Sequence, residues 1–428
     1  MKYQVLFLIV LSSMTSLAQQ TSSKEELMLG FLEANARDQI NFLEKTVNIN
    51  SGTLNLEGVR EVGMHYKKEL DDLGFETRWI SMPDSLNRAG HLFAEINGGS
   101  GKTILLIGHL DTVFEEDHEF QSFSRTGDTA EGPGANDMKG GNAIIIYALK
   151  ALEAAGELEN KHIIVAFTGD EEKPGHPLSV SRYDLVEAGK KADIALGFET
   201  ASGMNYATVA RRGSSGWTLK VKGKQAHSSG IFSKNTGAGA IFEAARILHS
   251  FYEDVKGEDL LSFNPGVILG GTNVRYDTNA STGTAFGKTN VVASELEVYG
   301  GLRFISEEQK EKTREKMRDI VRNNLPQTSA VISFSDAYPA MEPTEGNAKL
   351  LEVLDEVSQS LGYGEVKAYD PGKRGAADIS FIAQYVDGLD GLGAMGSGAH
   401  SPSETVNLET FIPLTQRAAV LIHRLGSE

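Results

Sequence analysis

Acidic and histidine side chains stand directly after three apolar segments of this sequence. The segments are 103–107, 162–168 and 194–198, and the side chains that follow them are His109, Asp111, Asp170, Glu171, Glu172 and Glu199. Short apolar runs of this kind are typical of strands buried on both faces of a sheet. In open α/β sheets, ligands bind beyond the carboxyl ends of the strands. We therefore expect these acids and the imidazole to converge in one crevice.

Asp137 is a further candidate, because it lies in the glycine-rich segment 132–141, where glycines permit a tight loop that enters a helix. Carboxylates that are crowded together repel one another strongly unless cations compensate them. Two divalent ions bridged by one carboxylate would stabilise such a crowd. The chain contains no cysteine, so nitrogen and oxygen atoms must hold any metal. This donor set favours zinc, with manganese or cobalt as alternatives.

Taken singly, each of these residues has a simpler interpretation. His109 could be a hydrogen-bonded core histidine, and Asp111 could cap a following helix. The pair Glu171 and Glu172 could be solvated loop residues. It is the combination at successive strand ends that predicts a metal site.

The segments 109–111, 132–141 and 170–172 closely resemble the zinc peptidase and amidohydrolase family that includes glutamate carboxypeptidase, the aminoacylases, succinyl-diaminopimelate desuccinylase and the tripeptide aminopeptidases. The resemblance covers nearly the whole chain after residue 18, and the motifs in this order are specific. It implies a zinc-binding domain that is interrupted by a lid domain, which also forms a dimer contact.

The resemblance implies five metal ligands, namely His109, Asp137, Glu172, Glu199 and His400. Asp137 would bridge the two ions, with His109 and Glu199 completing one zinc and Glu172 and His400 the other. His400 lies in the loop 398–404, and its residue type alone leaves its role undecided. Asp111 matches the family's acid that orients the ligand histidine, here His109. A histidine that binds a metal through one ring nitrogen needs a partner that holds the other.

Glu171 would then be the general base, because its neighbour Glu172 serves as a ligand and one carboxylate is left to take a proton from the attacking water. His227, in the segment 223–228, resembles the lid histidine that reaches into the partner subunit's site and stabilises the oxyanion. Each of these two roles is implied by the family and not by spacing.

Substrate contacts are also implied by the resemblance. Asn290 and Arg303 match positions that hold the carboxylate side of the substrate, and a guanidinium suits a carboxylate bidentately. Taken alone, an arginine at position 303 is more often a charge on a strand face than a substrate contact. Gly375 lies in the loop that offers backbone groups to that carboxylate, and we add the neighbouring Arg374 as a direct contact. The segments after His227 and after Glu172 depart from the usual family pattern, which leaves substrate choice open.

A length of 428 residues predicts two domains. Hydrophobic periodicity predicts helices at 25–47, 59–73, 141–155, 239–251, 307–325, 348–361 and 410–425. It predicts further strands at 76–80, 91–96, 216–221, 267–269, 291–304 and 330–335. The expected fold class is α/β, with a discontinuous dizinc catalytic domain, whose sheet is covered by helices, and an inserted α+β lid and dimerisation domain. The expected bounds are 1–18 for a signal peptide, 19–209 and 339–428 for the catalytic domain, and 210–338 for the lid.

The N-terminus reads as a secretory signal, with Lys2, an apolar run at 5–11 and a cleavage site after Ala18. The run is too short to span a bilayer. We therefore expect a periplasmic or secreted protein with no membrane span. A formal charge of −17 argues against nucleic acid as a partner, and the lack of cysteine excludes a disulfide framework.

Together these features predict a homodimeric dizinc metallopeptidase that hydrolyses an amide bond adjacent to a carboxylate in a small peptide or N-acyl amino acid. Carboxypeptidase-like action is favoured over that of an aminoacylase or a dipeptidase. Two remote alternatives are a two-metal phosphoesterase and a metal-binding protein without turnover.

Overall fold

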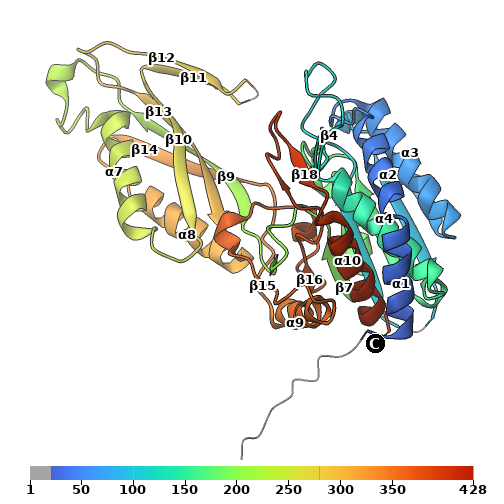
Figure 1. The fold of residues 1–428 in the computed structure, drawn as a ribbon. Coiled ribbons are helices and arrows are strands. Elements are labelled where there is room, and N and C mark those ends of the chain that lie inside the picture. Colours follow the sequence, from blue (N-terminus) through green and yellow to red (C-terminus); the bar gives the residue numbers. More distant parts are fainter. Residues whose placement is uncertain (1–20, 100, 279, 428) are drawn as a thin grey trace, which may run out of the picture.

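A six-stranded sheet forms the centre of the larger part of the molecule (Figure 1). The computed structural model describes residues 21–99, 101–278 and 280–427. The strand order is β1-β2-β6-β3-β7-β16. The bounds are Glu76–Ile80 for β1, His91–Asn97 for β2, Thr103–His109 for β3, His162–Thr168 for β6, Ile194–Gly197 for β7 and Gly388–Leu389 for β16. Strands β6, β3, β7 and β16 are parallel, whereas β2 runs opposite to both of its neighbours.

Helices cover both faces of this sheet, which explains the continuous apolar run of β3. Leu106 packs into the core on one face, and Leu105 and Ile107 pack into the core on the other. The first face carries α1 (Ser23–Ala34), α2 (Ala36–Val47), α3 (Leu56–Asp72), α4 (Lys139–Ala154) and α10 (Phe411–Leu425). The second face carries α6 (Tyr183–Gly189) and the 3-10 helix η5 (Asp378–Phe381), and α9 (Glu345–Ser360) packs against β16 and α10. The predicted helix-covered sheet is confirmed.

The prediction of a single helix over 25–47 is wrong, because α1 and α2 are separate helices divided at Asn35. The Asn35 side chain donates a hydrogen bond to the Phe31 carbonyl at 2.8 Å. Asparagine competes with the helical backbone for such bonds and therefore favours helix ends. Apolar spacing continues across the break, so periodicity alone did not reveal it.

Residues 213–336, which we call the inserted unit, contain a second sheet (Figure 1). Its order is β10-β13-β9-β14, with every neighbouring pair antiparallel. The bounds are Gly213–Gly223 for β9, Ser262–Gly271 for β10, Glu295–Phe304 for β13 and Thr328–Asp336 for β14. Helices α7 (Gly239–Asp254) and α8 (Glu307–Arg322) cover one face, where Trp217, Leu219 and Phe251 belong to a core of their own. This is the α+β insertion that the sequence predicts.

Shorter elements complete the fold. A hairpin of β11 (Asn273–Asp277) and β12 (Thr282–Phe286) extends from the inserted unit and was not predicted, because the alternation of β11 spans only five residues and the exposed β12 shows none. A small sheet, β17-β18-β5-β4, joins segments far apart in the sequence. Its bounds are Ser124–Thr126 (β4), Thr129–Glu131 (β5), Gly396–Ser397 (β17) and Thr405–Asn407 (β18). The remaining elements are β8 (Tyr206–Ala207), β15 (Lys367–Ala368), α5 (Leu178–Ser181), η1 (Asp84–Leu86), η2 (Leu158–Asn160), η3 (Ser228–Gly230) and η4 (Pro371–Lys373).

Two predictions of the sequence concern membranes and export. Among the described residues, no helix combines the length and apolar character that a membrane span requires. The signal peptide at 1–18, with cleavage after Ala18, lies outside the described residues.

Candidate metal centre and active site

The candidate site lies at the carboxyl edge of the parallel strands. His109 is the last residue of β3 and pairs with Thr168, the last residue of β6. The loops that leave β6 and β7 carry Glu171, Glu172 and Glu199 to the same edge. Parallel strands therefore bring together the side chains that the sequence predicted to converge, as expected for open α/β sheets.

His109 is held in one tautomer by its neighbours. Its ring is buried, and Nδ1 lies 3.0 Å from the backbone carbonyl of Asp111. A carbonyl oxygen only accepts, so Nδ1 carries a hydrogen, and Nε2 is the nitrogen left to bind a metal. Nε2 points to Asp137 Oδ1 at 3.3 Å and lies 3.7 Å from Glu199 Oε1. This is the orientation that a metal ligand needs.

Asp137 stands between the two histidines. Its Oδ1 faces His109, and its Oδ2 lies 3.2 Å from Nε2 of His400. The same nitrogen of His400 lies 3.1 Å from Oε2 of Glu172. The arrangement forms two groups, one with His109 and Glu199 and the other with His400 and Glu172, which share one carboxylate. Within the described part of the chain, His109, Asp137 and Glu172 offer ligand atoms that all lie within 4.8 Å of one another.

The electrostatics of this cluster match a site for cations. Burial and the nearby Asp137 raise the pKa of Glu199 to about 7. Hydrogen bonds to Asp137 and Glu172 raise the pKa of His400 to about 11. Both shifts reflect the surplus of negative charge gathered around these side chains, while burial adds to the shift of Glu199 and opposes that of His400. Divalent cations would remove that surplus, and the nitrogen and oxygen donors present fit zinc.

Asp111 connects the cluster to the loop of Glu171. Its buried carboxylate accepts hydrogen bonds from the backbone N–H groups of Glu171 at 3.0 Å and Glu172 at 3.1 Å, and from the Thr53 hydroxyl at 2.7 Å. Its Oδ1 also lies 3.5 Å from Nδ1 of His109. One side chain therefore touches a candidate ligand and holds two consecutive residues of the candidate active site. No helix follows Asp111, so the capping interpretation does not apply.

Glu171 lies beside the cluster and is half-buried. Burial and the neighbouring acids, with Glu199 first among them, raise its pKa well above the ordinary glutamate value. A raised pKa makes a carboxylate a stronger base, which suits a residue that must take up a proton.

The expectation that Asp170 joins the crowded acids is wrong. Its side chain turns away from the cluster and accepts hydrogen bonds from Gly175 N at 2.8 Å, Ser181 Oγ at 2.7 Å and the buried guanidinium of Arg182. Arg182 also donates to Asp378 at 2.8 Å. Isolated buried charges are costly, and this pairing satisfies Asp170 without a metal.

Glu404 has a structural role that the sequence did not reveal. Its buried carboxylate accepts hydrogen bonds from the backbone N–H groups of Gly134, Asn136 and Asp137, at 3.3, 2.9 and 2.9 Å. The bonds tie the loop of Asp137 to the loop of His400, and the pairing of β5 with β18 brings those loops together. The only sequence signal was that Glu404 ends the segment already noted around His400.

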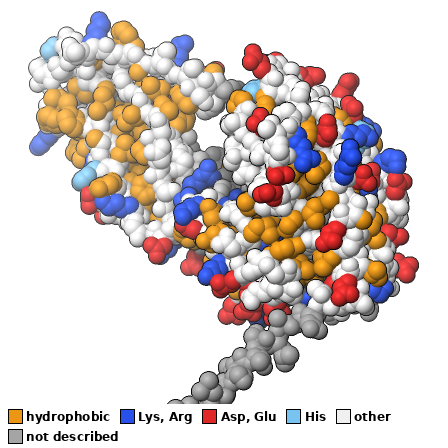
Figure 2. Space-filling model, in the orientation of Figure 1, with side chains coloured by type: hydrophobic (Ala, Val, Ile, Leu, Met, Phe, Trp, Pro, Cys, Tyr) orange, Lys and Arg blue, Asp and Glu red, His pale blue; other side chains and the backbone are white. Residues whose placement is uncertain are grey.

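A hollow of about 270 Å³ with a cationic lining lies where the inserted unit joins the larger part. Its lining comprises Arg212, Arg303, Gly372, Lys373, Arg374 and Gly375. Partial burial and the nearby Arg212 lower the pKa of Arg303, as expected for crowded cations. Figure 2 shows Lys and Arg side chains gathered at this junction. The structure thus brings Arg303, Arg374 and Gly375 together, and it adds Arg212 and Lys373, which the sequence analysis missed.

The hollow is connected to the metal cluster through Arg374. Its guanidinium donates to the backbone carbonyl of Thr200 at 3.1 Å, and Thr200 directly follows Glu199. Arg211 donates to the Gly375 carbonyl at 2.8 Å and to Asp390 at 2.6 Å, which fixes the loop that contains Gly375. An anion in the hollow would therefore lie near the Glu199 end of the cluster.

His227 and Asn290 lie close to each other on the inserted unit. The backbone N–H of Ser228 donates to the Asn290 carbonyl at 2.9 Å, and His227 pairs with Val291 in an isolated bridge. Both side chains are exposed. Across the described residues, no hydrogen bond or ion pair joins either side chain to the cluster of its own chain.

Comparison with known proteins identifies the family. The model of Peptidase family M20/M25/M40 matches residues 105–424. Carboxypeptidase G2 from Pseudomonas sp. (strain RS-16) is 29% identical over 399 residues, which cover 91% of this chain and 89% of that protein. Succinyl-diaminopimelate desuccinylase from Gluconobacter oxydans (strain 621H) is 26% identical over 356 residues, which cover 81% of this chain and 87% of that protein. The solved structure of aminopeptidase PepT from Bacillus cereus ATCC 10987 has a TM-score of 0.70 at 17% identity, covering 91% of this chain and 99% of that chain, and shows the same fold.

These findings define the protein as a hydrolytic enzyme that acts on amide bonds. The chain belongs to Peptidase family M20/M25/M40, and the resemblance drawn from its motifs is confirmed.

Proposed function

We propose that this protein is a dizinc metallopeptidase with carboxypeptidase-like action, which releases the residue that carries the substrate's free carboxylate. The observation that supports the proposal is the proximity of the cationic hollow to the metal cluster, through Arg374 and Thr200. A carboxylate bound by Arg303 and Arg374 would place the preceding amide bond toward the cluster. Guanidinium groups suit this task because they pair bidentately with carboxylates.

The five donors suit two ions. One ion would be held by His109 and Glu199, and the other by Glu172 and His400. Asp137 would bind both ions. When bound, zinc polarises a carbonyl group and lowers the pKa of water to near 7, and cobalt or manganese are alternatives for the same donors. The charge surplus described above favours cations at this site.

The side chains of the protein have distinct tasks in this proposal. Glu171 takes the proton from the attacking water and returns it to the leaving nitrogen. Asp111 keeps the His109 ring in its orientation and holds the backbone of Glu171. Asn290 and the backbone at Gly375 would contact the carboxylate side of the substrate.

His227 would act across a dimer. Its exposed position fits a role in the partner subunit's site, where it would stabilise the oxyanion. Exposed apolar side chains support an interface on the inserted unit, and Figure 2 shows hydrophobic side chains gathered on that unit. They include Ile241 and Phe242 on α7 and Ile268 on β10, which is an edge strand of its sheet. We accordingly propose a division into 19–209 and 339–428 for catalysis and 210–338 for the lid and dimer contact.

Light scattering tests this assembly. We expect a dimer, and we expect Ile241→Asp combined with Phe242→Asp to produce a monomer with little activity. His227→Ala should lose activity and remain dimeric. A fully active monomer would contradict the proposed role of His227.

Export to the periplasm or the medium is part of the proposal and depends on the signal peptide. Sequencing the N-terminus of the protein recovered from an expressing bacterial host would test it. A mature chain that begins at Gln19 is the expected result, and retention of Met1 in an intracellular protein would contradict it.

Hydrolysis of a matched substrate panel tests the function itself. The panel contains N-blocked dipeptides with a free C-terminal carboxylate, the same peptides as C-terminal amides, free dipeptides, N-acyl amino acids and a phosphomonoester. We expect metal-loaded protein to cleave the free-acid peptides and to spare their amides. Cleavage of N-acyl amino acids alone would favour an aminoacylase, and cleavage of free dipeptides alone would favour a dipeptidase. Turnover of the phosphomonoester alone would overturn the proposal.

A further inference from the structure

Two segments connect the inserted unit to the larger part, and they run side by side. Arg211 and Met341 exchange both backbone hydrogen bonds, at 2.9 and 3.0 Å. The backbone N–H of Ser214 donates to the Tyr338 carbonyl at 2.8 Å. Because the two segments are bonded to each other, a movement of the inserted unit displaces both together. We call this pair of segments, 211–214 and 338–341, the hinge.

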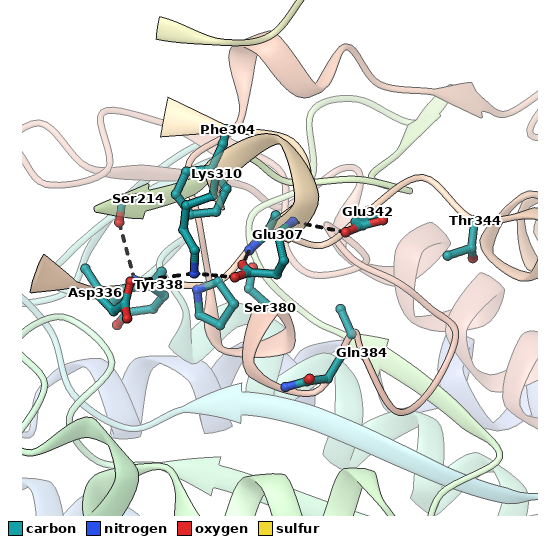
Figure 3. Close-up of a pocket in the computed structure, with 14 residues that line it drawn as sticks. Ser214, Phe304, Glu307, Lys310, Asp336, Tyr338, Glu342, Thr344, Ser380 and Gln384 are labelled. Carbon is teal, nitrogen blue, oxygen red and sulfur yellow. Dashed lines mark hydrogen bonds and ion pairs between the residues drawn. The ribbon is translucent and has the colours of Figure 1, made fainter. Parts of the chain in front are cut away.

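Tyr338 reaches from the hinge to the active site. Its hydroxyl donates a hydrogen bond to the backbone carbonyl of Glu171 at 2.7 Å. Its ring packs on Phe381, with ring centres 4.9 Å apart. Figure 3 shows Tyr338 in the wall of a pocket of about 520 Å³, together with Ser214, Lys310 and Ser380. The contact with Glu171 therefore crosses from the hinge to the loop after β6.

The backbone of Glu171 is thus held from two sides. Asp111, within the larger part, accepts the N–H of Glu171 at 3.0 Å, and Tyr338, on the hinge, donates to its carbonyl. The preceding residue, Asp170, is fixed by Arg182. Two planar peptide groups that are fixed on either side of Glu171 set the direction of its Cα–Cβ bond, from which the side chain extends. Of these contacts, the bond from Tyr338 is the one that depends on where the hinge lies.

We propose that Tyr338 is a positioning residue, which ties the backbone of the general base Glu171 to the hinge of the inserted unit. The proposal rests on the role given to Glu171 above. It makes the placement of the base depend on the position of the inserted unit, so that proton transfer is most effective when the hinge is in the arrangement that allows this bond. Misplacement of a reacting group by about 1 Å costs on the order of 100-fold in rate, so a small shift is sufficient.

The Tyr338 hydroxyl is suited to a permanent donor role. Burial, together with the nearby Glu171, raises the pKa of Tyr338 far above that of a free tyrosine. The hydroxyl therefore keeps its proton at neutral and moderately alkaline pH. A phenylalanine would keep the ring contact with Phe381 and remove only the hydrogen bond.

Tyr338→Phe tests the proposal, with Tyr385→Phe as the matched control, because Tyr385 is 46% exposed. Both variants are examined as full-length, metal-loaded protein. We expect kcat of Tyr338→Phe to fall by roughly tenfold, with KM within about twofold and an unchanged metal content. Amide hydrogen exchange in the peptide 168–175 should become faster in Tyr338→Phe and stay unchanged in the control.

The outcomes separate this proposal from the proposed function. An unchanged kcat together with unchanged exchange at 168–175 would overturn the role of Tyr338 while leaving the peptidase assignment intact. A change in KM alone would also overturn it, since that indicates substrate binding. If wild-type protein cleaves no amide, the proposed function fails, and the exchange comparison still decides whether Tyr338 holds the Glu171 loop.

Discussion

The carboxylate of Asp111 accepts the backbone N–H of Glu171 at 3.0 Å. A side chain that follows β3 thus positions a residue that follows β6, and the same carboxylate lies 3.5 Å from Nδ1 of His109. The candidate ligand and the candidate base therefore share one support. Disturbing this support should affect metal binding and proton transfer together.

Asp111→Asn should weaken metal binding by about 10- to 100-fold, the usual effect of losing a group that supports a ligand. Oδ1 accepts the N–H of Glu171, and Oδ2 accepts the N–H of Glu172 and the Thr53 hydroxyl. In the variant, the asparagine NH2 group takes the place of one of these two oxygens. Whichever oxygen it replaces, it would face a backbone N–H, and two donors cannot form a hydrogen bond with each other. Zinc affinity measured by competition with a chelator tests this. Asp117→Asn, at an exposed position, is the control, and equal affinity in both variants would refute the supporting role of Asp111.

Asp137→Asn should lose both ions, because Asp137 is the carboxylate shared by the two groups. Glu199→Gln, in contrast, should weaken one ion more than the other, since Glu199 belongs to the His109 group alone. Elemental analysis after dialysis measures the number of ions per chain. Retention of two ions by Asp137→Asn would show that this residue does not bridge.

Arg303→Gln should raise KM for free-acid peptides by about 10- to 100-fold, the equivalent of one lost hydrogen-bonded ion pair. The C-terminal amides of the same peptides should be poor substrates of the wild type, with a high KM that the substitution leaves unchanged. Steady-state kinetics on the paired substrates makes the comparison, with Arg318→Gln on α8 as the control. An equal rise in KM for acid and amide would mean that Arg303 does not bind the carboxylate.

Glu25→Gln should destabilise the protein by about 1–2 kcal/mol at pH 7, because Glu25 accepts a hydrogen bond from Arg424 at 2.7 Å and joins α1 to α10. Burial alone would raise the pKa of Glu25, but Arg424 and Ser22 outweigh it and hold the pKa below 4.5. A depressed pKa contributes stability that is present above pH 4.5 and is lost as the pH falls through the folded-state value.

Urea unfolding at pH 7 and at pH 3 measures this difference. We expect the gap in unfolding free energy between wild type and Glu25→Gln to shrink at pH 3. Glu26→Gln, in the same turn of α1 but exposed, should behave as wild type at both values. A gap that is unchanged by pH would contradict an ionic contribution from Glu25.

The strands and most of the cluster were predictable because their signals are local. The apolar run of β3 and the acids after β6 and β7 each lie within a few residues, and the parallel arrangement brings their ends to one edge. What the sequence could not determine is the direction of each side chain. Asp170 and Glu171 are adjacent, yet one pairs with Arg182 and the other faces the cluster, and only the packed structure separates them.

The remaining site residues could not be predicted because their contacts join distant parts of the chain. Glu404 binds a loop 267 residues earlier, and Tyr338 binds a carbonyl 167 residues earlier. Arg212 and Lys373 become neighbours only where the inserted unit returns to the larger part. His400 was assigned by family resemblance, and its contact with Glu172 gives that assignment a physical basis.

The rate of amide hydrolysis by metal-loaded Glu171→Gln, relative to wild type, tests the central claim most directly. Glutamine cannot accept the proton from water, so we predict at least a 1,000-fold lower kcat on a free-acid peptide, on the order of a general base's contribution, with two ions per chain retained. A rate within tenfold of wild type at the same metal content would contradict the assignment of Glu171 as the base and the mechanism that depends on it.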